Sequence, residues 1–305
     1  MSDVTVLMAT FDGEKFLAAQ LDTIRYQTCG RIDVIVSDDK STDSTRALLE
    51  EWQTRWSRGR FILLDGPGEG FAENFRNLIV NAPVETGIVA FADQDDLWDT
   101  EKLKDAGAWL ASQPPGIPAL FCGRTENFGA GGAIGHSPLF LRPPCFSNAL
   151  IQSIAGGNTM VMNREAFDLL REASRRTSFV SHDWWAYQLV TGAGGIVHYS
   201  ARPYTRYRQH DANQVGSNNT HRARMARFRL LLEGRFRKWT DANIAALSLC
   251  RDLLTPEALE TLDRFAQSRN AGLPTRLAGL QHSGVFRQTS KGQVALYVAT
   301  ALRKI

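Results

Sequence analysis

A short apolar run that ends in a cluster of acids is the feature that most constrains this chain. Residues 88–92 are all apolar, and Asp93, Asp95 and Asp96 follow within four positions. A run of this kind is typical of a buried strand, so the acids lie at its carboxyl end, where open α/β sheets bind ligands. Clustered carboxylates suit Mg²⁺ or Mn²⁺. The alternative is a solvated acidic turn that caps the next helix.

The first 112 residues alternate between strand-like and helix-like segments. Strands are expected at 4–9, 33–37, 60–64 and 88–92, and helices at 16–24, 44–52, 71–81 and 100–111. Strands that alternate with helices of this length predict βαβ units and a largely parallel sheet. We therefore expect an α/β fold, with a Rossmann-like, mostly parallel sheet flanked by helices.

The pattern changes after Pro114 and Pro115. Strands are expected at 119–122, 159–162 and 196–199, and helices at 164–173 and 181–192. Beyond residue 216 the chain is expected to be helical, with breaks at Gly234, Pro256 and 272–274. The expected organisation is one domain over 1–216, with halves at 1–112 and 113–216, and a helical C-terminal extension over 217–305.

Composition excludes several classes of protein. The 305 residues are 43% hydrophobic and 22% charged, which is ordinary for a soluble globular chain. A net charge of +3 gives no reason to expect nucleic acid as a partner. The four cysteines form no C-x-x-C pair, which fits a reducing compartment and disfavours a zinc site or disulfides. No apolar stretch approaches the ~18 residues that span a bilayer, so a cytoplasmic protein is expected.

A second acidic pair, Asp38 and Asp39, ends the strand expected at 33–37. In a parallel sheet this pair shares an edge with the cluster that follows residue 92. The turn after the first strand, residues 10–14, has no G-x-G-x-x-G pattern, and the chain has no Walker A loop. A nucleotide would therefore need carboxylates for its base and ribose and a cation for its phosphates.

Several segments now carry a resemblance to a known family. Residues 4–12, 34–43 and 90–98 resemble the corresponding regions of family-2 inverting glycosyltransferases with the GT-A fold. The segments at 70–75, 93–98, 182–185 and 207–210 together resemble the rhamnosyltransferase-like branch. The resemblance covers about 4–216 and implies that 1–112 is the nucleotide-binding half and 113–216 the acceptor half. Each motif alone is weak, but four in the right order are specific.

The resemblance implies nucleotide contacts on the first strands. Thr10 and Phe11 are expected to lie along the edge of the nucleobase. Asp39, with Asp38 behind it, is expected to accept a hydrogen bond from a pyrimidine. The alternative for the two acids is capping of the following helix. Asn74, on the helix after the glycine-rich loop, is expected to reach ribose or diphosphate.

The acidic turn is expected to hold the cation. The resemblance implies that Asp95 is the ligand of Mn²⁺ or Mg²⁺. Asp93 is expected to contact ribose or a metal-bound water, and Gln94, between the two acids, is expected to contact the nucleotide-sugar. Asp96 is expected to be structural. Arg208 suits phosphate, and His210 is expected to be an additional metal ligand, with a purely structural histidine as the alternative.

The base that inverting transfer needs is expected at Asp183. The family usually has an E-D pair at this helix start, whereas this chain has His182 and Asp183, so the first acid is replaced. His182 is expected to orient the acceptor, with a surface N-cap role as the alternative. Trp184 and Trp185 are expected to stack on the acceptor sugar, with core packing as the alternative.

The expected function is metal-dependent inverting transfer of a sugar from a nucleotide-sugar, with dTDP-L-rhamnose favoured, to a saccharide or lipid-linked saccharide in cell-surface polysaccharide synthesis. One alternative is the same reaction with a UDP-sugar as donor. A second is a sugar-1-phosphate nucleotidyltransferase, which would need a basic glycine-rich loop after the first strand. A third is a non-catalytic binding module.

The basic segment 221–239 has apolar residues at near-helical spacing. It is expected to touch the inner face of the cell membrane. A helix packed on the domain is the alternative.

Overall fold

The computed structural model describes residues 2–210 and 234–305. Among these residues, nine strands form one sheet in the order β3-β2-β1-β4-β8-β6-β9-β5, and β7 pairs with β6. The strands are β1 (Val4–Thr10), β2 (Ile32–Asp38), β3 (Phe61–Asp65), β4 (Ile88–Ala92), β5 (Leu97–Trp98), β6 (Ala119–Gly129), β7 (Gly132–His136), β8 (Val161–Asn163) and β9 (Ile196–Arg208).

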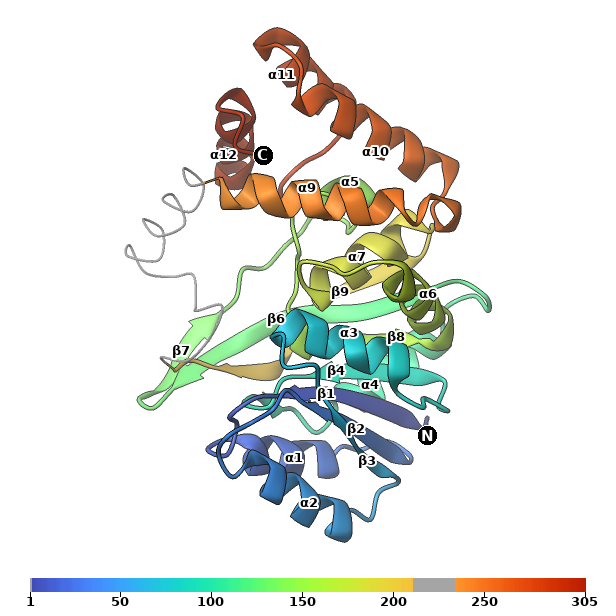
Figure 1. The fold of residues 1–305 in the computed structure, drawn as a ribbon, viewed down its shortest axis with the longest axis vertical. Coiled ribbons are helices and arrows are strands. Elements are labelled where there is room, and N and C mark those ends of the chain that lie inside the picture. Colours follow the sequence, from blue (N-terminus) through green and yellow to red (C-terminus); the bar gives the residue numbers. More distant parts are fainter. Residues whose placement is uncertain (1, 211–233) are drawn as a thin grey trace.

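Helices cover both faces of this sheet (Figure 1). In the first half they are α1 (Leu17–Arg25), α2 (Thr45–Arg55), α3 (Phe71–Asn81) and α4 (Lys102–Ala111). The second half adds α5 (Phe146–Ala149), the 3₁₀ turn η1 (Gly157–Thr159), α6 (Arg164–Arg176) and α7 (His182–Gly192). The C-terminal helices are α9 (Arg235–Ser248), the 3₁₀ turn η2 (Arg251–Leu253), α10 (Pro256–Arg269), α11 (Leu273–His282) and α12 (Ser290–Ala301).

The register of the parallel strands aligns their carboxyl ends. β1 lies between β2 and β4, with Thr10 opposite Asp38 and Met8 opposite Ala92. The segments that leave these three strands therefore start at one edge of the sheet. All residues of β2 and β4 are buried, which explains the apolar runs at 34–36 and 88–92.

The second half joins the same sheet. β8 is antiparallel to both β4 and β6, and β9 runs parallel to β6. The end of β9 is antiparallel to β5, where Leu97 pairs with Arg206. Because β5 directly follows the acidic turn, this pairing brings the end of β9 back to that turn. The halves expected at 1–112 and 113–216 are thus joined by continuous strand pairing.

Two hydrophobic cores lie on the two faces of the sheet. One is formed with α1, α2 and α4, and the other with α3, α6 and α7. The second core continues into the C-terminal helices through Leu247, Phe265, Leu280 and Leu296. In Figure 1 these helices form a further layer above α7. The boundary expected at 216/217 and most of the segment 221–239 lie outside the described residues.

Most expected elements are confirmed, and the differences lie in the second half. β6 and β9 are much longer than expected, and β5, β7 and α5 were not predicted. The outer part of β9 alternates irregularly between buried and exposed residues. A strand without a regular apolar period gives little sequence signal.

The first turn of α7 points its aromatic side chains into the protein. His182 stacks on Phe75 with ring centroids 3.5 Å apart and meets the edge of Phe91. Trp184 Nε1 donates to the carbonyl of Ala149 at 2.6 Å, and Trp185 belongs to the second core. Burial lowers the pKa of His182 to about 4. The imidazole is therefore neutral near pH 7.

No helix among residues 2–210 and 234–305 combines the length and hydrophobicity needed to cross a membrane.

Truncation of a buried residue in α10 is expected to destabilise the whole chain. Phe265 is buried in the core shared by the sheet and the C-terminal helices. We expect Phe265→Ala to lower the free energy of unfolding by about 3–5 kcal/mol within a single cooperative transition in urea. Leu249→Ala, at an exposed position, should change it by no more than about 0.5 kcal/mol. Two separable transitions, with only one affected, would contradict the shared core.

His182 is expected to make stability depend on pH. The unfolded chain protonates this histidine below its ordinary pKa of 6.5, whereas the folded chain protonates it only near 4. Between these values the unfolded state binds more protons, so stability falls as the pH is lowered. From near pH 7 to about pH 5 the loss should be about 2 kcal/mol.

The measurement is the urea midpoint at both pH values. His182→Leu should remove this part of the pH dependence, while His282→Leu, at an exposed site, should keep it. An unchanged pH dependence in His182→Leu would refute the assignment.

Candidate functional site

The acids at the end of β2 hold the loops at the carboxyl edge of the sheet. A ligand is expected to bind at this edge, and we call that place the crevice. Asp38 Oδ1 accepts from Thr10 Oγ1 at 2.9 Å and from Ser41 Oγ at 2.6 Å. Asp39 accepts from the amides of Gly68 at 2.6 Å and Gly70 at 2.8 Å. Both glycines have positive φ, which favours glycine. Asp39 therefore holds the glycine-rich loop, and its carboxylate, with about four lone-pair sites, keeps capacity for a ligand donor.

Gln94 joins the loops that follow β1 and β4. Its Oε1 accepts from the amide of Phe11 at 2.9 Å, and its Nε2 donates to the carbonyl of Phe11 at 2.8 Å. A Cβ added at Gly13 would lie 2.4 Å from Gln94 Oε1. The amide of Gln94, expected at the nucleotide-sugar, is thus used to fix the Phe11 loop, while the Phe11 ring is exposed.

Asn74 lies beneath the crevice. It is 1% exposed, and its Nδ2 donates to the carbonyl of Ser37 at 2.9 Å and to that of Thr10 at 3.4 Å. The side chain therefore ties the ends of β1 and β2 together. The expected contact of Asn74 with ribose or diphosphate stays a prediction.

Four carboxyl groups interact at the end of β4. Burial, followed by the charges of Asp96, Asp95 and Asp183, holds the pKa of Asp93 well above its usual range. Burial and the charge of Asp95 raise the pKa of Asp96 to about 7. The ring of Phe91, in β4, lies 5.0 Å from that of His182, at the start of α7. The acidic turn after β4 and Asp183 are therefore neighbours although they are far apart in sequence. Such a cluster favours a bound cation.

A buried lysine lies beneath the acids and was not predicted. Lys102 Nζ donates to the carbonyl of Asn158 and lies 3.3 Å from the centroid of the Trp98 ring. Burial pushes the pKa of Lys102 well below its usual range, against the opposing charges of Asp96 and Asp93. Asn158 Nδ2 also donates to Asp96 Oδ2. These contacts confirm the structural role expected for Asp96, which is fully buried.

Neither Lys102 nor Asn158 carried a sequence signal for this role. Lys102 lies in the segment 101–104, Glu-Lys-Leu-Lys, which reads as a solvated start of a helix. Asn158 follows two glycines and reads as a turn residue. Burial of both depends on packing between distant segments.

The end of β9 completes the site. His210 Nε2 lies 2.7 Å from Asp95 Oδ2. Arg208 donates from Nε to the carbonyl of Asp95 at 2.8 Å and from its backbone amide to Asp96 Oδ1 at 3.1 Å. The guanidinium of Arg208 also lies over the rings of Phe16 and Phe128. Arg208 and His210 are thus both held at the acidic turn.

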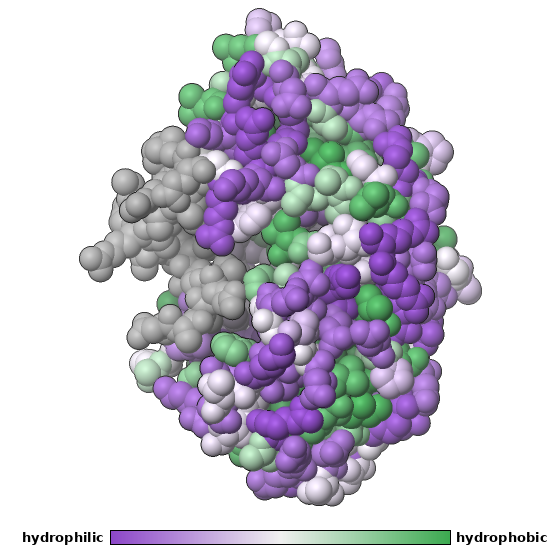
Figure 2. All heavy atoms as spheres, viewed as in Figure 1, coloured by the Kyte–Doolittle hydropathy of each residue, from purple (hydrophilic) through white to green (hydrophobic). Residues whose placement is uncertain are grey.

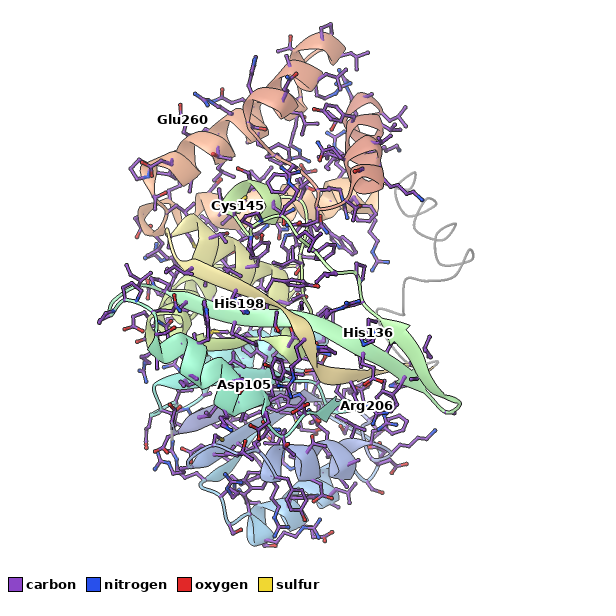
Figure 3. The ribbon with its side chains drawn as sticks, turned by 180° about the vertical axis from the view of Figure 1, so that it is seen from behind. Asp105, His136, Cys145, His198, Arg206 and Glu260 are labelled. Atoms are coloured by element: carbon purple, nitrogen blue, oxygen red, sulfur yellow. The ribbon has the colours of Figure 1, made fainter. Side chains whose placement is uncertain are left out.

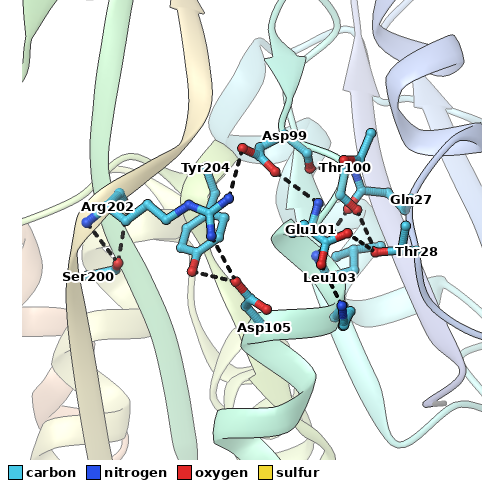
Figure 4. A network of polar contacts seen from close by, with 11 residues as sticks. Gln27, Thr28, Asp99, Thr100, Glu101, Leu103, Asp105, Ser200, Arg202 and Tyr204 are labelled. Carbon is cyan, nitrogen blue, oxygen red and sulfur yellow. Dashed lines mark hydrogen bonds and ion pairs between the residues drawn. The ribbon is translucent and has the colours of Figure 1, made fainter.

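A polar network anchors β9 upstream of this point (Figure 4). Arg202 pairs with Asp99 at 3.2 Å and with Asp105 at 3.3 Å, and the hydroxyl of Tyr204 donates to Asp105 at 2.8 Å. Asp99 and Asp105 lie just before and within α4. Figure 3 shows Asp105 and Arg206 on this side of the molecule. The network fixes the strand that carries Arg208 to the helix that follows the acidic turn.

The donor set at Asp95 fits a divalent cation that is shared with a ligand. Mg²⁺ is usually held by one or two protein carboxylates together with substrate phosphates and water. Asp95 Oδ2 and His210 Nε2 offer two adjacent donor atoms, and Asp93 lies two positions away. Among the described residues no group of three or more metal-ligating side chains is preassembled. The remaining ligands of such a cation would come from phosphate oxygens.

The residues expected at the acceptor divide into two groups. Asp183 is partly exposed in the first turn of α7, with Oδ1 accepting from the amide of Trp184 at 2.7 Å. His182, Trp184 and Trp185 are buried. Side chains of one helical turn point in different directions, so Asp183 is partly exposed while these three rings pack in the core. Their expected contacts with the acceptor stay predictions.

Similar proteins point to one family. The model of the glycosyl transferase family 2 matches residues 5–168. The dTDP-rhamnosyl transferase RfbG of Shigella flexneri is 27% identical over 240 residues, which are 76% of this chain and 81% of that protein. The UDP-Glc:alpha-D-GlcNAc-diphosphoundecaprenol beta-1,3-glucosyltransferase WfgD of Escherichia coli is 29% identical over 101 residues, which are 33% of this chain and 38% of that protein.

Solved structures share the fold. TarS 1–349 of S. aureus in complex with UDP-GlcNAc aligns with a TM-score of 0.56 at 14% identity, covering 98% of this chain and 90% of that one. The mannosyltransferase PcManGT of Pyrobaculum calidifontis, in complex with GDP-Man and Mn²⁺, aligns with a TM-score of 0.50 at 19% identity, covering 99% and 86%. The fold is GT-A with a helical C-terminal extension, as expected. With its family model matching more than half of the sequence, this chain is a glycosyltransferase that belongs to glycosyl transferase family 2.

Proposed function

We propose that this glycosyltransferase is metal-dependent and inverting, and that it transfers a sugar from a nucleotide-sugar to a saccharide acceptor. The observation that carries the proposal is that Asp93 and Asp95, directly after β4, lie near Asp183, because Phe91 of β4 meets the ring of His182 at the start of α7. Acids on the strand ends provide a place for the nucleotide-sugar, and an acid on a separate helix provides a base for the acceptor. A binding module would not need the second acid.

We assign the cation, Mn²⁺ or Mg²⁺, to Asp95 and His210. When bound, it would neutralise the negative charge that develops on the departing diphosphate. Arg208 supports the same phosphates, since its guanidinium is held beside Asp95. We assign Thr10, Phe11 and Asp39 to the nucleobase, and Asp93 to ribose or a metal-bound water.

Asp183 acts as the general base. The acceptor hydroxyl attacks the anomeric carbon of the donor sugar, and its proton passes to the carboxylate of Asp183. The new bond joins the acceptor oxygen to the anomeric carbon, while the bond from that carbon to the diphosphate oxygen breaks and the nucleoside diphosphate leaves with the electron pair. A single displacement inverts the anomeric configuration.

The donor that we favour is dTDP-L-rhamnose, with a UDP-sugar as the second candidate. The Shigella flexneri relative named as a dTDP-rhamnosyl transferase aligns over most of this chain, which supports the first. The named UDP-glucosyltransferase aligns over a third of it. We propose a saccharide or lipid-linked saccharide of a cell-surface polysaccharide as the acceptor, met at the cytoplasmic side of the membrane.

Replacement of the proposed metal ligand should abolish the metal dependence of donor binding. Asp95→Asn keeps the size of the side chain but removes its charge. We expect the gain in affinity for dTDP or UDP that Mn²⁺ produces to fall by more than about tenfold, measured by titration calorimetry with Mn²⁺ and with chelator. Asp168→Asn, the same change at an exposed ion pair on α6, is the control. Equal binding by the wild type with and without Mn²⁺ would contradict the metal assignment.

Replacement of the proposed base should separate binding from transfer. We expect Asp183→Asn to lower the transfer rate by about 10²–10⁴-fold, because the amide cannot take the proton from the acceptor. Affinity for the nucleoside diphosphate should stay unchanged, since the Asn oxygen can still accept from the amide of Trp184. Transfer is followed as nucleoside diphosphate release from dTDP-L-rhamnose and UDP-sugars. Loss of donor binding in this variant would refute the role.

A further inference from the structure

The last helix presents an apolar surface away from the protein. Val294, Tyr297, Val298 and Leu302 are 65%, 38%, 45% and 53% exposed. Three of them recur at a spacing of four residues and Tyr297 lies beside them, so they share one side of α12. We call these four residues the α12 apolar face. Figure 2 shows hydrophobic side chains at the surface over α12, at the upper left.

This face is not the packing side of the helix. Leu296, Ala299 and Thr300 are buried and hold α12 against the remainder of the protein. A helix that is apolar on all sides is normally buried on all sides. An apolar patch that remains exposed on a folded chain marks a surface that meets a partner.

The helix is held rigidly in place. Thr289 caps its amino end by accepting from the amide of Gly292. At the other end, the buried side chain of Arg276 donates from Nε to the carbonyl of Thr300 at 2.7 Å and from Nη2 to that of Ala301 at 3.0 Å. The exposure of the α12 apolar face is thus a feature of an ordered helix and not of a frayed terminus.

Positive charge surrounds the apolar face. Residues 264–305 contain no Asp or Glu, and of their seven Lys or Arg residues only Arg269 and Arg276 are buried. Lys291 and Arg303 flank the face and are exposed. The amino end of α9 lies beside it, since Arg237 Nη1 donates to the carbonyl of Arg303 at 3.3 Å. Arg237 itself is paired with Asp241, so the added positive charge comes from Arg235 and Lys238, which are exposed. The partner of this surface should therefore be apolar at its centre and anionic around it.

We propose that the α12 apolar face docks on the surface of an anionic phospholipid bilayer. Its apolar side chains would enter the headgroup boundary, and Lys291 and Arg303 would meet the lipid phosphates, as in amphipathic helices that lie in the membrane interface. A symmetric dimer through this face is disfavoured, because it would bring the basic side chains of both copies together. The proposal does not depend on the donor or metal assignment.

The test is sedimentation of the full chain with vesicles made of equal parts phosphatidylcholine and phosphatidylglycerol. The wild type should bind, and binding should weaken as salt is added. The double variant Val298→Asp/Leu302→Asp should lose at least about tenfold in binding, because it places charge in the lipid boundary. Leu249→Asp, at an exposed apolar position directly after α9, is the control and should bind like the wild type.

Charge is tested separately. Lys291→Glu and Arg303→Glu should each weaken binding by about fivefold or more, and vesicles of phosphatidylcholine alone should bind poorly. If thermal unfolding shows that the aspartate variant is destabilised, Val294→Gln/Val298→Gln, at two highly exposed positions, replaces it. Nucleoside diphosphate binding should be unchanged in all of these variants, which separates this result from the proposed function.

Three results would overturn the proposal. The first is absence of binding to anionic vesicles by the wild type. The second is an equal loss in Leu249→Asp and in the α12 variant. The third is a wild-type dimer in light scattering that becomes monomeric in Val298→Asp/Leu302→Asp, because the face would then be an interface between copies of this chain.

Discussion

The contact between a buried lysine and a loop carbonyl is the interaction on which the site depends. Lys102 is enclosed beneath the acidic turn, where its ammonium meets the carbonyl of Asn158 and the face of Trp98. Asn158 in turn bonds Asp96 with its amide and accepts from the hydroxyl of Thr205 with its carbonyl. The turn after β4, helix α4, the 3₁₀ turn η1 and strand β9 therefore meet around one cation. Removal of either partner would leave a buried polar group or charge uncompensated, which is costly.

The first half of the fold could be predicted because its sequence obeys local rules. β2 and β4 are buried on both faces, and their centres, residues 34–36 and 88–92, are continuously apolar. α3 begins and ends at the predicted residues. The second half follows weaker rules. β5 has two residues and exists only because β9 pairs with it. The outer part of β6 alternates buried and partly buried positions that include Arg124 and Glu126, a pattern that resembles a loop when its partner strand is unknown.

The site was predictable where function coincides with the end of a strand. The acids after β2 and β4 lie at one edge because parallel strands run in one direction, and that direction follows from the βαβ pattern. The side-chain directions within α7 were not predictable in the same way. His182, Asp183 and Trp184 are neighbours in sequence, yet only Asp183 faces the crevice, and the choice is made by Phe75 and Phe91, which enclose the imidazole. Helical spacing alone does not say which side is the inner one.

The double hydrogen bond between Gln94 and the backbone of Phe11 has a consequence for donor choice. It joins the loop after β1 to the loop after β4, so the proposed base site and the proposed metal site belong to one rigid body. The distance between the proposed nucleobase site and the proposed diphosphate site is therefore fixed before a donor binds. Nucleoside diphosphates that differ only in the sugar they carry share that span. Discrimination among them must therefore come from the side of the crevice that the second half supplies.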